Sequence, residues 1–130
     1  MIDPIIAIDN TTDRKTKELN EALEAMEAYL LNVSPHRTTI SVQAETGTLG
    51  FTSRKGRWGI YLEVPGDPTL RDFSQMSIAQ RLDVVRAFPS LVAKIVEHKQ
   101  KRLDDLNAAL DAADAVLGSL PKLPKREPAK

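Results

Sequence analysis

The sequence predicts a two-layer α+β domain with the element order α-β-β-β-α-α. Apolar residues recur at spacings of three and four before residue 34 and again after residue 90, which is the period of an amphipathic α-helix. Between residues 39 and 64, apolar and polar residues alternate, as in a strand with one buried face. An antiparallel sheet with one polar face needs a helical layer over its apolar face. We therefore expect a three-stranded antiparallel β-meander covered by an N-terminal helix and by C-terminal helices.

The composition is that of one globular domain without covalent cross-links. The chain has 130 residues, of which 42% are hydrophobic, and its formal net charge is zero. It contains no cysteine, which excludes disulfides, thiolate nucleophiles and cysteine-ligated metals. The first ten residues lack the basic start and long apolar run of a secretory signal, and no stretch approaches the ~20 apolar residues of a membrane-spanning helix. We expect a cytoplasmic protein with a single domain over residues 1–118.

The N-terminal helix is expected over residues 11–33. Asn10 can act as its N-cap, and Pro35 ends it because the residue before a proline is displaced from the helical region. The preceding segment is interpreted as a leader whose apolar run, Ile5–Ile8, docks on the core rather than adding an edge strand. The buried face of the helix is expected to consist of Leu19, Leu23, Met26, Leu30 and Val33.

The predicted meander has two short turns and a definite end. Turns are expected at Thr46-Gly47 and at Arg54–Arg57, because glycine follows a polar residue in each. The run Pro65–Pro68 ends the third strand, and a loop to about Met76 follows. The three strands are expected over residues 39–44, 48–53 and 58–64.

Two helices are predicted after the meander. Ser77 and Gln80 have the spacing of a capping box, which opens a short helix. Pro89 breaks or kinks that helix and is well placed in the first turn of the next one. The long C-terminal helix then runs over about residues 90–118, where Gly118 favours a helix end. Residues 119–130 are expected to form a flexible, basic, proline-rich tail.

The long helix carries a heptad pattern that is longer than its own domain. A helix of this length measures about 43 Å, whereas a seven-residue strand spans only about 23 Å. Part of its apolar face therefore lacks an obvious cover within the chain. The heptad residues are Val92, Val96, Lys99, Leu103, Leu106, Leu110, Ala113, Leu117 and Leu120.

The charge order predicts how this face is covered. Both long helices begin basic and continue acidic, so antiparallel pairing would bring opposite charges together. Lys99 would then face Glu24 or Glu27. We expect pairing within the chain for the first half of the long helix. For residues 103–120 we expect contact with another chain, because leucines left in water would form an apolar patch that monomers rarely keep.

The sequence offers little for catalysis. His36 and His98 have no spaced Asp, Glu or Ser that would suggest a triad or a metal site. Nucleotide-binding loops, zinc-protease motifs and calcium-binding loops are also missing from the sequence. We therefore expect a non-enzymatic protein that needs no cofactor and no metal.

The function predicted first is protein–protein interaction, as a small accessory, assembly or regulatory protein. The partner is expected to be a second copy of the chain, another protein, or both, and the mixed charges of the long helix argue against membrane binding. A small-ligand-sequestering oligomer is a further alternative. The predicted interface consists of Val96, Lys99, Leu103, Leu106, Leu110 and Leu117.

Nucleic-acid binding is the main alternative. A hairpin tip with three cations and an aromatic residue can grip phosphate and stack on bases. The order of elements is similar to that of double-stranded-RNA-binding domains, but their glycine- and lysine-rich entry to the last helix has no counterpart in residues 65–76. The basic tail would add to this contact. The tip residues are Arg54, Lys55, Arg57 and Trp58.

Overall fold

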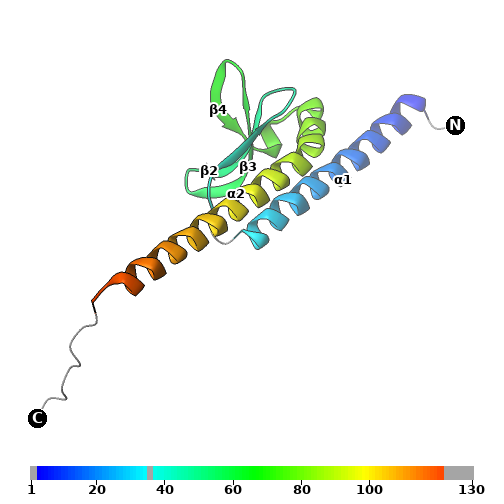
Figure 1. The fold of residues 1–130 in the computed structure, drawn as a ribbon. Coiled ribbons are helices and arrows are strands. Elements are labelled where there is room, and N and C mark those ends of the chain that lie inside the picture. The colour runs from blue at the N-terminus through cyan, green and yellow to red at the C-terminus, as the bar shows by residue number, and fades with distance from the viewer. Residues whose placement is uncertain (1–2, 35–36, 122–130) are drawn as a thin grey trace, which may run out of the picture. The chain divides into compact units, whose positions relative to one another are not determined.

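The computed structural model describes residues 3–34 and 37–121 and has the expected α+β class (Figure 1). A long helix is followed by an antiparallel sheet, a short 3-10 helix and a second long helix. The sheet has four strands, so the prediction of three was wrong by one. The chain forms two compact units, residues 1–95 and the residues from Val96 onward.

Helix α1 spans Pro4–Val33 and so begins well before the predicted start at residue 11. Asp3, rather than Asn10, is its N-cap, and the Asp3 carboxylate accepts a hydrogen bond from the backbone N–H of Ile5 at 2.8 Å. Pro4 fits the first turn because a proline there gives up an N–H that has no partner within the helix. The apolar run that was interpreted as a docked leader is therefore the first turn of the helix.

The two ends of α1 differ in burial. Leu23 and Leu30 are fully buried, as predicted, and Leu19 and Met26 are partly buried against them. Every residue from 3 to 15 is exposed. Only the C-terminal part of α1 therefore belongs to the core, and the predicted docking of the N-terminal isoleucines was wrong.

The sheet is an antiparallel meander with the strand order β1-β2-β3-β4. The first three strands lie close to their predicted positions. The strands are β1 Ile40–Gln43, β2 Thr48–Arg54, β3 Arg57–Val64 and β4 Asp67–Arg71.

The fourth strand lies in the segment that was predicted to be a loop. Pro65 and Gly66 form a two-residue turn in which Gly66 has a φ of 83°, and this turn pairs Val64 with Asp67. Pro68 is tolerated in β4 because β4 is an edge strand. The 3-10 helix η1, Phe73–Gln75, occupies the rest of the predicted loop.

Helix α2 spans Ile78–Ser119 without a break. The predicted capping box is present, since the Ser77 N–H donates to Gln80 Oε1 at 2.9 Å and the Gln80 N–H donates to Ser77 Oγ at 3.1 Å. Pro89 lies inside the helix, so the predicted separation into two helices was wrong. The helix continues through Pro89 because Val84 and Leu91, on either side of it, are buried in the same core and offset the lost hydrogen bond.

Figure 1 shows α1 and the part of α2 directly after Pro89 running in the same direction, whereas the part of α2 before Pro89 turns away from that direction. Arg81, near the start of α2, donates a hydrogen bond to Asn20 of α1 at 2.9 Å. The antiparallel orientation predicted from charge order was therefore wrong for these segments. Exposed ion pairs contribute too little to set the orientation of helices whose apolar faces share a core with a sheet.

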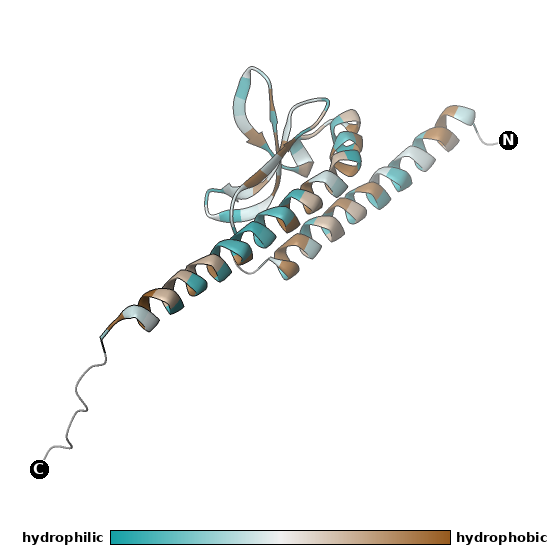
Figure 2. Cartoon of the chain, viewed as in Figure 1, coloured by the Kyte–Doolittle hydropathy of each residue, from teal (hydrophilic) through white to brown (hydrophobic). Residues whose placement is uncertain are grey.

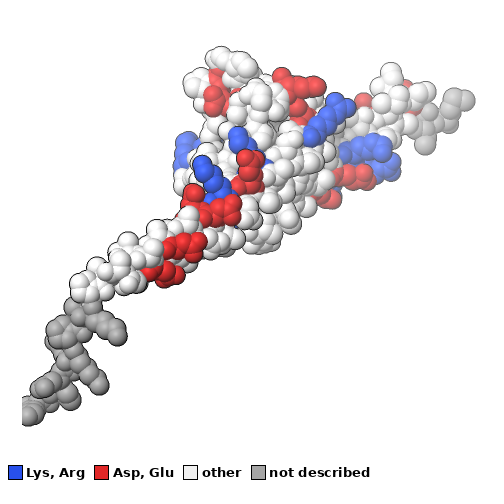
Figure 3. Space-filling model, in the orientation of Figure 1, with Lys and Arg blue, Asp and Glu red and all other residues white. Residues whose placement is uncertain are grey.

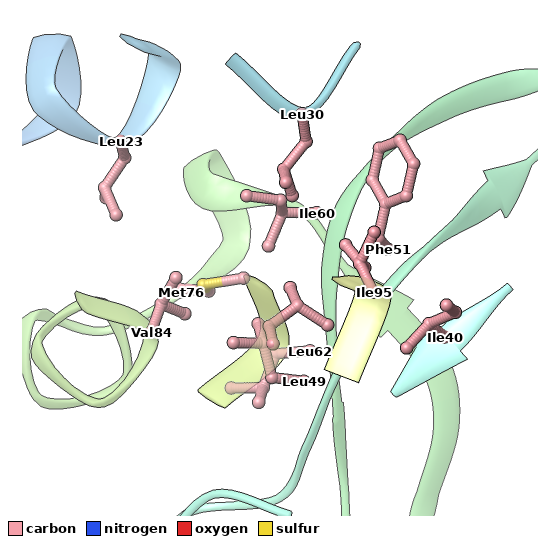
Figure 4. Close-up of a cluster of buried hydrophobic side chains, with 11 residues drawn as sticks. Leu23, Leu30, Ile40, Leu49, Phe51, Ile60, Leu62, Met76, Val84 and Ile95 are labelled. Carbon is pink, nitrogen blue, oxygen red and sulfur yellow. The ribbon is translucent and has the colours of Figure 1, made fainter. Parts of the chain in front are cut away.

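The core lies between the inner face of the sheet and the two helices (Figure 4). Leucine, isoleucine and valine dominate it, as the low aromatic content predicts. Its fully buried side chains come from α1, β2, β3 and α2, so that each layer contributes to the same cluster. They are Leu23, Leu30, Leu49, Phe51, Ile60, Leu62, Val84 and Leu91.

A buried carboxylate connects α2 to the loop between β1 and β2. Asp83 accepts hydrogen bonds from the N–H of Glu45 at 3.2 Å and from the N–H and hydroxyl of Thr46 at 2.8 and 2.6 Å. Burial alone would raise the pKa of Asp83, but these three hydrogen bonds outweigh it and hold that pKa below its usual value. The charged form of Asp83 therefore stabilises the contact between helix and sheet.

Candidate interaction surface

The predicted interface on the C-terminal part of α2 is exposed in the structure. Every residue from 96 to 121 is exposed apart from Lys99, which is half-buried. The apolar members of the predicted interface have exposed fractions between 50% and 66%. We call these five residues the C-terminal row: Val96, Leu103, Leu106, Leu110 and Leu117.

The C-terminal row follows one side of the helix over its length. The spacings between its members are combinations of three and four residues, so they lie on a single stripe. From Val96 to Leu117 the stripe measures about 32 Å. Figure 2 shows apolar residues recurring along this part of α2. This surface is large and continuous enough to serve as a helix–helix interface.

The charges beside the C-terminal row are separated along the helix. The stretch Lys99–Arg102 is basic, and the stretch Asp104–Asp114 contains four aspartates and no cation. Figure 3 shows acidic side chains gathered on the C-terminal part of α2. The segment therefore has a direction that an approaching charged partner can recognise.

A second exposed apolar set lies at the start of α1. Ile5, Ile6 and Ile8 have exposed fractions of 69%, 55% and 64%. The sequence analysis missed this surface because it placed these residues in a docked leader. The pair Asp3-Pro4 is the feature that could have revealed it, since an N-cap residue followed by proline is a typical helix start.

The predicted basic tip is a tight β-turn in the first unit. Lys55 and Gly56 form its two central residues, with φ values of 53° and 79°, which is the backbone twist that a two-residue hairpin favours. Lys55 and Arg57 are exposed, whereas Trp58 is half-buried with its ring 5.5 Å from that of Phe51. The tip therefore presents the exposed cations Lys55 and Arg57 but only part of the predicted aromatic surface.

Arg54 makes structural hydrogen bonds at the same tip. Its guanidinium donates hydrogen bonds to the carbonyl of Leu70 and to Gln75 Oε1, and it lies 6.0 Å from the ring centre of Tyr61. These contacts connect β2 to the end of β4 and to η1. Arg54 is therefore less available to a ligand than its position in the sequence suggests.

An open hollow of about 470 Å³ lies beside this tip and has walls of both charges. The three basic residues of the tip line one part of it, and carboxylates of α1 and of the segment before η1 line another. Glu27, one of these carboxylates, accepts a hydrogen bond from the N–H of Ile60 at 2.9 Å. Such carboxylates would repel phosphate, and nucleic-acid binding at this tip stays a prediction. The acidic residues are Glu24, Glu27 and Asp72.

The remaining sequence predictions concern histidines, the tail and one ion pair. His98 is exposed on α2, whereas His36 and residues 122–130 lie outside the described residues. Within residues 3–34 and 37–121, no cluster of three or more potential metal ligands was found. The pairing of Lys99 with Glu24 or Glu27 would join the two units and stays a prediction.

Comparison with known protein families, curated proteins and solved structures finds no match for this chain. Within the part of the chain that the structure describes, neither long helix has a stretch apolar enough to cross a bilayer. The functional argument therefore depends on the surfaces of the molecule itself.

Proposed function

We propose that this protein is a non-enzymatic self-association module that binds through the C-terminal row. The observation that supports the proposal is the exposure of five aliphatic residues on one stripe of a helix, each more than half-exposed except Leu103, which is 50% exposed. Monomeric proteins rarely leave a contiguous apolar surface of this kind in water. Amphipathic helices with this spacing associate by packing their stripes together.

The first test is the oligomeric state in solution. We expect the wild-type chain to sediment as an oligomer at tens of micromolar. The double substitution Leu106→Asp/Leu110→Asp places two charges in the middle of the C-terminal row, where burying an unpaired carboxylate is strongly unfavourable. We expect this variant to be monomeric, with the circular dichroism of the sheet and core unchanged.

A matched control separates loss of the interface from the effect of added charge. Ala108 and Ala115 lie on the same helix but off the C-terminal row, and both are exposed. The variant Ala108→Asp/Ala115→Asp adds the same two charges and should stay oligomeric. A monomeric wild type, or equal behaviour of the two variants, would contradict the proposal.

If the oligomer also sequesters a small ligand, mass spectrometry of the denatured protein should detect a released compound.

A further inference from the structure

The C-terminal row has a near-symmetric arrangement about the middle of its helix. Val96 and Leu117 lie at its two ends, and Leu103 and Leu110 lie at equal distances from a point between Leu106 and Asn107. A stripe with this symmetry can pack against an identical stripe that runs in the opposite direction. In that arrangement Val96 lies level with Leu117 and Leu103 lies level with Leu110, whereas Leu106 lies beside the axis, level with Asn107.

The charges beside the row are ordered along the helix, because the basic stretch Lys99–Arg102 is followed by aspartates from Asp104 onward. Lys99 and Arg102 precede the midpoint of the row, and Asp111 and Asp114 follow it at matching distances, whereas Asp104 and Asp105 also precede it. Two antiparallel copies would place each basic pair opposite an acidic pair, whereas two parallel copies would place like charges together. Lys99 is decisive here, because it lies on the heptad pattern and would face its own copy in a parallel pair.

The length of the free helix fits the same arrangement. Ile95 is the last buried residue of α2, and the helix ends at Ser119. The symmetric segment Val96–Leu117 occupies the helix between these two residues and covers about three heptads, the shortest length at which a heptad pattern indicates a coiled coil.

We propose that two copies of this chain form a dimer in which their C-terminal rows pack antiparallel, about a two-fold axis near Leu106 and Asn107. This inference rests on the proposed function and adds the number of copies, their orientation and their register. An antiparallel pair of identical surfaces closes on itself, so association stops at the dimer rather than continuing into a filament.

The orientation can be measured with spin labels because the chain has no native cysteine. Gln100 and Asn107 are one heptad apart on the same side of the helix, next to the row rather than on it. In the antiparallel dimer, labels on Asn107→Cys lie close to the axis. Labels on Gln100→Cys are separated by about 20 Å along the helix axis in addition to the distance between helices. Pulsed electron resonance should therefore give a clearly longer distance for Gln100→Cys than for Asn107→Cys.

The outcomes separate this inference from the proposed function. Equal distances at the two sites would indicate a parallel dimer and overturn the inference while self-association stands. The absence of any dipolar distance, together with monomeric sedimentation of the unlabelled chain, would overturn both. A dimer that survives the Leu106→Asp/Leu110→Asp substitution would place the interface elsewhere and also overturn both.

Charge reversal gives a second test that does not depend on labels. The variant Lys99→Glu/Arg102→Glu places acidic residues opposite acidic residues, and we expect the dimer dissociation constant to rise about tenfold or more. Adding Asp111→Lys/Asp114→Lys to the same chain restores opposite charges and should return the constant to within about threefold of wild type. Failure of the four-residue variant to recover affinity, while circular dichroism shows an intact helix, would contradict the antiparallel orientation.

Discussion

At the scale of single residues, Asp83 is a buried polar group that joins α2 to the loop between β1 and β2. Its carboxylate accepts three hydrogen bonds from Glu45 and Thr46. The substitution Asp83→Asn replaces an acceptor oxygen with an NH₂ group that cannot accept from these donors. We expect the free energy of unfolding at pH 7 to fall by about 1–3 kcal/mol, measured by urea denaturation. The exposed substitution Asp9→Asn should leave it unchanged.

The pH dependence of this contribution follows from the direction of the pKa shift. The pKa of Asp83 is lower in the folded protein than in the unfolded chain, where it is about 3.9. Its stabilisation is therefore complete above the unfolded pKa and is lost as the pH falls through the folded pKa. The stability difference between wild type and Asp83→Asn should narrow between pH 5 and pH 3. An equal difference at both pH values would show that the charge of Asp83 does not matter.

At the scale of elements, Pro89 is the least favourable residue in the longest helix. Proline has no N–H to donate to the carbonyl four residues earlier, which here belongs to Val85. Pro89 itself is exposed, so an alanine would fit without filling or emptying the core. We expect Pro89→Ala to raise the free energy of unfolding by about 1–3 kcal/mol in urea denaturation, and Ser90→Ala to change it much less. A less stable Pro89→Ala variant would show that a bend at Pro89 is needed to seat Leu91 in the core.

Some helices, strands and turns could be predicted from the sequence, and others could not. The capping box at Ser77 and the glycine turn at Gly56 are local features, and both define the boundaries that the structure has. The missed β4 contains Pro68, and its pairing with β3 is irregular between Leu62 and Val64, so its alternating pattern is weak. The continuous helix through Pro89 could not be predicted from local sequence, because burial of residues on both sides of Pro89 outweighs the low helix propensity of proline.

At the scale of the whole molecule, periodicity predicted which residues share a face but not what that face contacts. The heptad pattern was expected to start at Val92 and to cover one surface. In the structure, Leu91 and Ile95 face the core, whereas Val96 is 59% exposed. The direction of α1 relative to α2 also could not be predicted from the sequence, because it depends on how both helices pack against the sheet. The C-terminal row is exposed, and its role as an interface stays a prediction. The isoleucines at the start of α1 form an exposed surface that the sequence analysis missed.

The proposed association should also determine how stable the C-terminal part of α2 is. No residue between 96 and 119 is buried within the described chain, and helices without tertiary packing are marginal in water. Amide hydrogen exchange of residues 96–119 should therefore be slow in the dimer and should accelerate on dilution or in Leu106→Asp/Leu110→Asp. Core amides of β2 and β3 provide the internal control, because their protection reflects folding of the first unit and should not change. Slow exchange of residues 96–119 in a monomeric sample would show that the chain itself protects this helix, and would remove the physical reason for the C-terminal row to bind a second copy.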